Sequence, residues 1–343
     1  MIIFGIETSC DETAAAVVES GTREICSVVA SSKEFHEKTG GIVPEVAARK
    51  QVEFITPVIS ECFEKYRKEK KFDTLEDCYR GIDAVAVTVG PGLIGSLVVG
   101  VEAAKALSLF LNKPLIPVNH LVGHIYGNFV NNTQELLLPA IVLLVSGGHT
   151  DLVLMKDHGN FEYLGGTLDD AVGEAYDKVA RLLGLSKYLG GAILSKKALE
   201  CDENTIKGRL PRPMVDQDNF DFSFSGLKTA SKRIIELNQY PQEVIAREFE
   251  EAVVEVLVKK TIRAARKFNV KTIMLGGGVS ANIHLREEVK KEADKLGIST
   301  QVPPIRLCTD NAVYIASAAY FNNKSVGYEN VEVNPSLGIM DKL

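Results

Sequence analysis

The sequence predicts a mixed α/β protein of two similarly built lobes, and three observations predict it. At 343 residues the chain is too long for one ordinary core and suits two domains of about 150–170 residues. The apolar runs 2–6 and 14–18 flank a polar turn, a pattern typical of a β-hairpin. The same strand–turn–strand pattern recurs roughly 140 residues later, as expected for a duplicated architecture.

The first predicted lobe covers residues 1–132. After the hairpin, 25–30 forms a third predicted strand, and apolar residues at helical spacing predict a helix over 44–66. The remaining predicted elements are a buried strand, a helix of small residues and a short strand, at 82–89, 97–111 and 115–118.

The second predicted lobe covers residues 133–312, and the polar stretch 131–135 marks the boundary. Its hairpin is predicted at 140–145 and 151–155, with a further strand at 271–275. Helices are expected over 169–183, 242–267 and 282–296, the first of them with a capping-box-like start at Thr167 and Asp170. The C-terminal segment 313–343 is expected to pack back on the first lobe.

Composition narrows the class of protein. No apolar run reaches the roughly 20 residues needed to span a bilayer, and Glu7 follows the first apolar run too early for a signal peptide. The six cysteines include no C-x-x-C pair, which argues against a zinc ribbon and a disulfide framework and favours the cytosol. Cys10 is expected to be a buried or turn cysteine; a nucleophile is the alternative. The net charge of −6 argues against a protein that coats DNA.

Two histidines are candidates for a metal site. His120 and His124 are four residues apart, so on a helix both would lie on one face, close enough to bind one metal ion. Leu121 stands where a zincin protease needs its glutamate, which argues against a metalloprotease. Asp310, before an apolar helix, is a candidate third ligand. The alternatives are two ordinary histidines and a helix-capping aspartate.

Two glycine turns are candidates for nucleotide binding. The turn 146–150 joins two predicted strands, and 276–282 joins a strand to a helix, where the positive end of the helix dipole favours anions. Neither is a Walker A loop, and each alone has a purely structural alternative. Asp177 lies on the polar face of the predicted helix 169–183. That face lines a binding site or is simply solvated.

A middle segment is more basic than the rest of the chain. Residues 181–233 contain ten Lys/Arg and six Asp/Glu, although the whole chain is acidic. Lys207, Arg209 and Arg212 are candidate contacts for a polyanion. Solvated helix faces are the alternative.

Nine sequence blocks together resemble the bacterial TsaD (Gcp/YgjD) family from end to end. They are GIETSCDET (5–13), GGIVPEVAAR (40–49), GPGLIG (90–95), NHLVGH (119–124), LLVSGGHT (143–150), DDAVGEAYDK (169–178), FSFSGLKT (222–229), GGVSAN (277–282) and CTDNA (308–312).

The resemblance implies the ASKHA (actin-like/sugar kinase) fold, with two RNase H-like lobes and a nucleotide cleft between them. It implies an N6-L-threonylcarbamoyladenine synthase. Such an enzyme transfers the threonylcarbamoyl group from threonylcarbamoyl-adenylate to N6 of adenosine 37 in tRNAs that read ANN codons. The products are t6A and AMP.

The resemblance also implies the site residues. One Fe²⁺ or Zn²⁺ ion per subunit would be bound by His120, His124 and Asp310 and would assist the transfer. The adenylate would be contacted by Leu144, Val145, Ser146, Gly147, Gly148, Asp177, Gly191 and Asn282. The implied partners are tRNA, a TsaB-like pseudo-paralogue and a TsaE-like ATPase, in the cytoplasm and without a membrane.

One block departs from the family pattern. Leu189 and Ala192 replace the two prolines of the usual Tyr-Pro-Gly-Gly-Pro, which makes the turn before Gly191 less rigid. Two other classes of function remain as alternatives. A small-molecule kinase of the same superfamily would not need the histidine pair, and a non-catalytic paralogue would not need to keep the metal and glycine residues.

Overall fold

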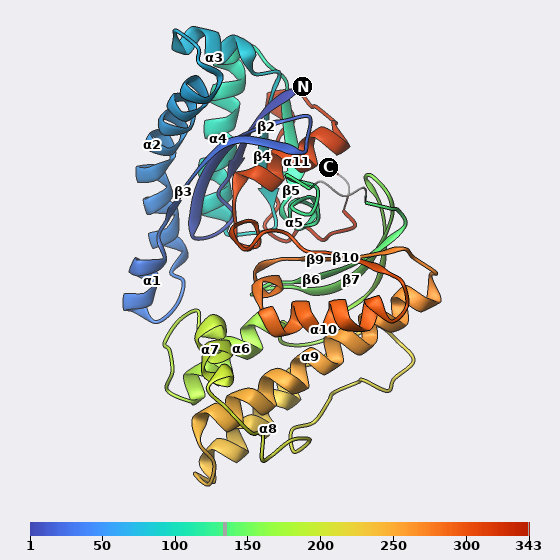
Figure 1. The fold of residues 1–343 in the computed structure, drawn as a ribbon. Helices are drawn as coiled ribbons and strands as arrows, with labels where there is room; N and C mark the ends of the chain where they lie inside the picture. The colour runs from blue at the N-terminus through green and yellow to red at the C-terminus, as the bar shows by residue number, and fades with distance from the viewer. Residues whose placement is uncertain (133–135, 342) are drawn as a thin grey trace. The chain divides into compact units, whose positions relative to one another are not determined.

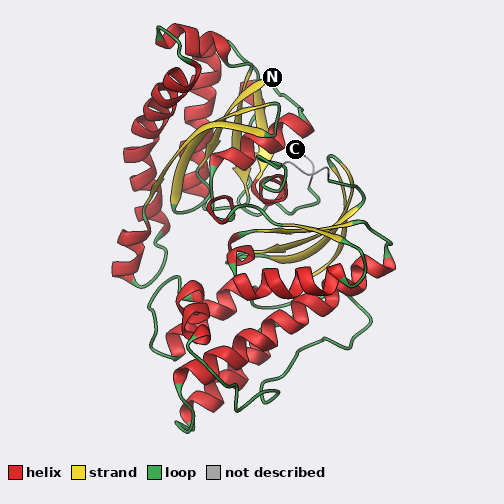
Figure 2. Ribbon diagram, viewed as in Figure 1, coloured by secondary structure: helices red, strands yellow, loops and turns green. Residues whose placement is uncertain are grey.

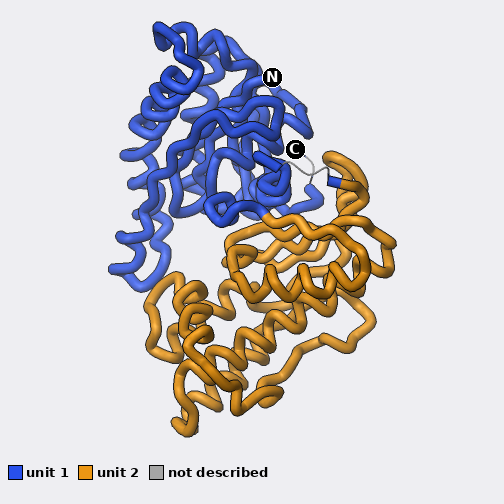
Figure 3. Tube along the Cα trace, in the orientation of Figure 1, with its two compact units in different colours: residues 1–136, 303–343 blue, residues 137–302 orange. Residues whose placement is uncertain are grey.

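The chain divides into two compact units in this computed structural model, which describes residues 1–132, 136–341 and 343 (Figure 3). Unit 1 comprises Met1–Leu136 and Pro303–Leu343, and unit 2 comprises Leu137–Val302. Residues 133–135 of the predicted boundary lie outside the described residues.

The second boundary differs from the prediction, since unit 1 resumes at Pro303 and not at 313. The reason is a set of contacts made by the segment just before the last helix. Arg306 pairs with Glu24 at 2.5 Å, and Asp310 lies 3.5 Å from His120. Both partners belong to unit 1, so residues 303–312 pack with it.

Unit 1 is a five-stranded mixed sheet of order β3-β2-β1-β4-β5 with helices on both faces (Figure 1). Its strands are β1 (Ile2–Glu7), β2 (Glu12–Glu19), β3 (Arg23–Ser31), β4 (Ala84–Gly90) and β5 (Leu115–Asn119). Its helices are α1 (Lys33–Thr39), α2 (Pro44–Lys70), α3 (Leu75–Gly81), α4 (Ile94–Leu111), α5 (His120–Tyr126) and α11 (Ala312–Asn322).

Side-chain alternation along β1 assigns its two faces. Phe4 stacks on Phe63 of α2 with ring centroids 4.5 Å apart, so the even-numbered residues face α2 and α4. Gly5 faces α11 on the other side, and a Cβ atom there would lie 2.6 Å from the Ala312 carbonyl oxygen. Only glycine therefore lets α11 lie this close to the strand. Glu7 shares the face of Gly5 and points to the side of α11.

Unit 2 is a five-stranded mixed sheet of order β10-β9-β6-β7-β8 (Figure 2). Its strands are β6 (Ala140–Val145), β7 (Thr150–Asp157), β8 (Asn160–Gly166), β9 (Thr272–Gly276) and β10 (Ser299–Gln301). Its helices are α6 (Val172–Leu182), α7 (Gly191–Leu199), α8 (Ser225–Glu236), α9 (Gln242–Lys267) and α10 (Ile283–Asp294). One core joins the buried stripes of these helices to Ile141, Leu143 and Val145 of β6.

The predicted hairpins, the long helices and strand β9 are confirmed, whereas the capping box of the first unit-2 helix is wrong. Helix α6 begins at Val172, whose N–H donates to Thr150 Oγ1 at 2.8 Å. Thr167 instead donates to the Asp170 carbonyl, which closes a turn before the helix. The tertiary partner on β7 replaces the local cap.

Helix α4 is, among the described residues, the one helix long and apolar enough to cross a membrane by those two criteria alone. Its buried face packs on α2 and β4 through residues such as Leu97 and Val101. Its other face exposes Ile94, Val98 and Leu109 at helical spacing, whereas Phe110 packs edge-on against Tyr79 of α3 with ring centroids 5.4 Å apart. The apolar character of α4 therefore accompanies a helix that is packed into unit 1 on one side.

Candidate functional site

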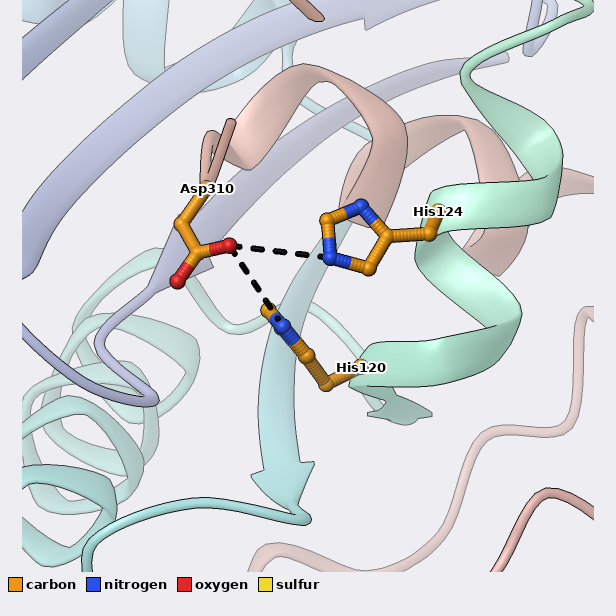
Figure 4. Close-up of side chains that lie close together, drawn as sticks. All are labelled: His120, His124 and Asp310. Atoms are coloured by element: carbon orange, nitrogen blue, oxygen red, sulfur yellow. Dashed lines mark ion pairs between the residues drawn. The ribbon is translucent and has the colours of Figure 1, made fainter. Parts of the chain in front are cut away.

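The candidate metal ligands converge in unit 1 (Figure 4). His120 and His124 lie on one face of α5, and their Nε2 atoms are 3.5 and 3.6 Å from Asp310 Oδ1. The three ligand atoms lie within 4.8 Å of one another, and both histidines are buried. Two imidazole nitrogens and one carboxylate oxygen form a donor set that suits iron or zinc and leaves coordination positions for other ligands.

Asp310 is available because a neighbouring residue caps the last helix. The Asn311 side chain accepts hydrogen bonds from the N–H groups of Val313 and Tyr314 at 3.1 and 3.2 Å. The helix therefore needs no aspartate as its N-cap. The Asp310 carboxylate projects instead toward the two histidines, as Figure 4 shows.

Glu7 joins this cluster and was not predicted as a site residue. Its carboxylate is fully buried and accepts hydrogen bonds from Ser9 N at 2.5 Å, Thr88 Oγ1 at 2.5 Å and His120 Nδ1 at 3.1 Å. Burial by itself would raise the pKa of Glu7, but the neighbouring His120 and these hydrogen bonds keep it below its usual value. The sequence feature that could have identified Glu7 is its position as a charged residue at the end of an otherwise apolar strand.

The carboxylates of Glu7 and Asp310 also shift the pKa of His120. Burial alone would lower the pKa of His120, but Glu7 and Asp310 raise it to about 9. Burial raises the pKa of Asp310, and His120 opposes that shift. The cluster thus attracts positive charge at the point where the three ligand atoms meet.

Two further acidic residues reach the same carboxylate. Asp11, just before β2, and Glu12, its first residue, have oxygens within 4.8 Å of an Asp310 oxygen. Burial is the main cause that raises the pKa of Glu12, and its neighbours Asp11 and Asp310 add to it. Lys33 forms an ion pair with Glu12 and offsets part of this negative charge.

The surroundings of Cys10 favour a turn cysteine over a nucleophile. The thiol is free and half-buried, and burial together with the nearby Asp11 raises its pKa far above the usual range. A thiol that resists deprotonation is a poor nucleophile.

The predicted nucleotide residues all lie in unit 2, at the end of β6 and the turn after it, on α6, and at the starts of α7 and α10. Leu144 and Val145 are buried strand residues, so only their backbone groups are available to a ligand. Gly147 and Gly148 in the following turn are exposed, with open space where a side chain would stand. Gly173, at the start of α6, donates its N–H to the Ser146 carbonyl at 3.2 Å and thereby joins the helix to this turn.

Asp177 and Gly191 are in direct contact. The Asp177 carboxylate accepts a hydrogen bond from Gly191 N at 3.0 Å, where α7 begins. Burial raises the pKa of Asp177 although the N–H groups of Gly191 and Gly190 lower it. Leu189 has a φ of +50°, a value that a proline ring cannot adopt. The replacement of the usual proline therefore accompanies a different local backbone.

The Asn282 side chain is occupied within the protein. Its Oδ1 caps α10 by accepting from Leu285 N at 2.8 Å, and its Nδ2 donates to Ser195 Oγ at 2.9 Å and Glu250 Oε1 at 2.7 Å. A nucleotide at this position would therefore meet the backbone at the start of α10, while the side chain holds that backbone in place.

The three candidate RNA contacts differ in their surroundings. Arg212 is largely buried and is held by Glu248 at 2.6 Å and Glu255 at 2.9 Å, so it has a structural role. Arg209 donates to the Tyr240 hydroxyl at 2.5 Å and lies over that ring, and Lys207 lines an open pocket of about 710 Å³. Only Lys207 and Arg209 keep the exposed character that the sequence prediction assumed.

Comparison with known proteins agrees with the motif pattern. Residues 24–317 match the family model TsaD, described as tRNA N6-adenosine threonylcarbamoyltransferase. A Bacillus subtilis protein of that name is 49% identical over 324 residues, which cover 93% of this chain and 89% of the relative. A Persephonella marina protein of the same name is 47% identical over 330 residues, which cover 95% of this chain and 92% of the relative.

Solved structures show a similar fold at low sequence identity. HypF from T. kodakarensis matches with a TM-score of 0.60 at 15% identity, over 96% of this chain and 47% of HypF. Component A of (R)-2-hydroxyglutaryl-CoA dehydratase from Acidaminococcus fermentans matches with a TM-score of 0.52 at 14% identity. The match covers 93% of this chain and 98% of component A. These likenesses confirm the predicted ASKHA fold class. With the family model covering most of its length, the chain belongs to the TsaD family of tRNA N6-adenosine threonylcarbamoyltransferases.

Proposed function

We propose that this chain forms t6A by transferring the threonylcarbamoyl group of threonylcarbamoyl-adenylate to N6 of adenosine 37 in tRNAs that read ANN codons. The N6 amine attacks the carbamoyl carbonyl carbon, the new C–N bond forms, the C–O bond to the phosphate breaks, and AMP leaves with that electron pair. The amine gives up one proton. The observation that carries the proposal is the convergence of His120, His124 and Asp310 in a chain of this family.

The three converging residues would hold one Fe²⁺ or Zn²⁺ ion. Their two nitrogens and one oxygen fit either metal, and the buried carboxylates nearby favour a cation. Such an ion supplies Lewis-acid stabilisation of negative charge on a carbonyl or phosphate oxygen. The protein's own part is to fix the direction of the ligand atoms, which α5 and the Asn311 cap accomplish.

The adenylate would be bound by unit 2. The side-chain-free turn at Gly147 and Gly148 lets backbone N–H groups approach phosphate oxygens, and the start of α10 adds a helix dipole. Asp177 is an acceptor for ribose hydroxyls through the oxygen that does not bind Gly191.

A TsaB-like pseudo-paralogue and a TsaE-like ATPase are the proposed protein partners. The exposed apolar face of α4, defined by Ile94, Val98 and Leu109, supports an apolar protein contact, which we assign to the TsaB-like subunit. Leu109→Glu should abolish co-elution with that subunit, while Lys290→Glu, an exposed charge reversal on α10 of unit 2, retains it. Equal co-elution of both variants would place the contact elsewhere.

The tRNA would be contacted through Lys207, Arg209 and the pocket beside them. That pocket is lined by seven Lys/Arg and four Glu, so its balance favours a phosphate backbone. Because tRNA is the substrate, we place the protein in the cytoplasm.

The decisive experiment is mass analysis of tRNA nucleosides. Unmodified tRNA is incubated with this chain, its partners, threonine, bicarbonate, ATP and an adenylate-forming enzyme. Formation of t6A that depends on this chain is the expected result. Phosphorylation of a small hydroxylated substrate in place of t6A would favour the kinase alternative.

A further inference from the structure

Glu7 of unit 1 stands behind one of the candidate metal ligands. It is the last residue of β1, fully buried, and its Oε2 lies 3.1 Å from His120 Nδ1. The other ring nitrogen of the same histidine, Nε2, is the one that faces Asp310 at 3.5 Å. The three groups therefore form a chain in the order Glu7, His120, Asp310.

The hydrogen-bond pattern determines which nitrogen of His120 carries a proton. An ionised carboxylate has no hydrogen to donate, so Nδ1 must donate to Glu7. Thr88 Oγ1 donates to the same oxygen at 2.5 Å and Ser9 N donates to the other at 2.5 Å, so Glu7 itself is held by donors. In the neutral imidazole, the lone pair is then left on Nε2, on the side of Asp310 and His124.

We propose that Glu7 is a positioning residue that selects the Nε2 lone pair of His120 and holds the ring for metal binding. This inference rests on the proposed metal-assisted function. Carboxylates that hydrogen-bond a metal-binding imidazole fix its tautomer and orientation, and their loss typically weakens metal binding roughly 10–100-fold.

The fold explains why a residue so distant in sequence has this place. Glu7 lies on the face of β1 that α11 covers, and the absence of a side chain at Gly5 lets α11 approach the strand. The parallel neighbour β4 contributes Thr88, and β5 leads directly into α5 and His120. Four elements of unit 1 thus meet at one carboxylate.

The test compares Glu7→Ala and Glu7→Gln with the wild-type chain in two measurements. Competition dialysis with Zn²⁺ and Co²⁺ measures metal affinity, and the Co²⁺ absorption bands report ligand geometry. Nitrogen NMR of the metal-free protein above about pH 9, where the His120 imidazole is neutral, measures its tautomer. Glu7→Ala should lose roughly 10–100-fold in metal affinity and shift the proton toward Nε2. Glu7→Gln, which keeps an acceptor of the same shape, should lose less.

Two controls keep the outcomes separate. Glu250→Gln also alters a buried carboxylate, but in unit 2, and should leave metal affinity unchanged. If Glu7→Ala fails to fold, the comparison rests on Glu7→Gln. Folded variants with unchanged affinity, Co²⁺ bands and tautomer would overturn the proposal. A wild-type chain that binds no metal would instead contradict the proposed function, while the tautomer measurement would still decide the role of Glu7.

Discussion

The carboxylate of Asp177 accepts a 3.0 Å hydrogen bond from the backbone N–H of Gly191, although 14 positions separate the two residues. Both are candidate nucleotide contacts, one on α6 and the other at the start of α7. Since the bond joins the two helices, a change at Asp177 also acts on the turn that carries Gly191.

Asp177→Ala should therefore weaken adenine-nucleotide binding about tenfold, the equivalent of one hydrogen bond to a charged group. Asp177→Asn keeps an acceptor for Gly191 and should lose less. Titration calorimetry measures both affinities, and thermal unfolding shows whether the variants are folded. Unchanged affinity in a folded Asp177→Ala variant would make this side chain purely structural.

Replacing His120 and His124 together by Ala should remove the bound metal. The change deletes two of the three converging donors and leaves only Asp310, which is too little to bind a transition metal tightly. Elemental analysis of the purified protein should find about one metal ion per chain in the wild type and almost none in the double variant. His284→Ala, a histidine of unit 2, is the control; equal metal in all three proteins would exclude the site.

Arg212→Ala should destabilise the protein by about 3 kcal/mol, because Glu248 is fully buried and would lose its charged partner. Arg209→Ala removes an exposed side chain bonded to Tyr240 and should change stability by about 0.5 kcal/mol or less. Denaturant unfolding measures both values. Similar stability of the two variants would show that the remaining donors to Glu248, namely Gly208 N, Leu210 N and Asn204 Nδ2, satisfy its carboxylate.

Lys207→Gln with Arg209→Gln should weaken tRNA binding and reduce its salt dependence, since each lost phosphate contact releases about one counterion fewer. Both residues are exposed, so metal content and unfolding should match the wild type. Arg212 is kept because it holds Glu248. Filter binding across a range of salt concentrations measures the effect, and an unchanged slope would move the RNA surface away from this segment.

Lys260 should make stability rise with pH in alkaline solution. Burial lowers the pKa of this lysine to about 8, and Arg263 lowers it further than Asp221 raises it. Between pH 8 and the usual lysine pKa of about 10.4, the unfolded chain binds more protons than the folded one, so raising the pH favours the folded state. Thermal unfolding should show that the stability of the wild type, relative to that of Lys260→Met, increases with pH over this range. Lys259→Met changes an exposed neighbouring lysine, and its stability should depend on pH in the same way as that of the wild type.

Local pattern was sufficient for the elements whose signal is contained within themselves. The hairpin around 8–11, the exact span of β6 and the span of α9 follow from apolar runs and turn residues. Strand β8 and helices α7 and α8 were not predicted. They are short or have mixed burial, and they are stabilised by the unit-2 core more than by their own periodicity.

The sequence by itself determined the family, the strand and helix framework and the identity of the candidate ligands, because these depend on residue types at short spacing. Only the tertiary structure brought Asp310 to His120, placed Glu7 behind that histidine, and committed Arg212 to Glu248. The partners in these pairs lie 190, 113 and 36 positions apart in the chain. Such contacts depend on how strands and helices pack, and no local pattern of residues encodes that packing.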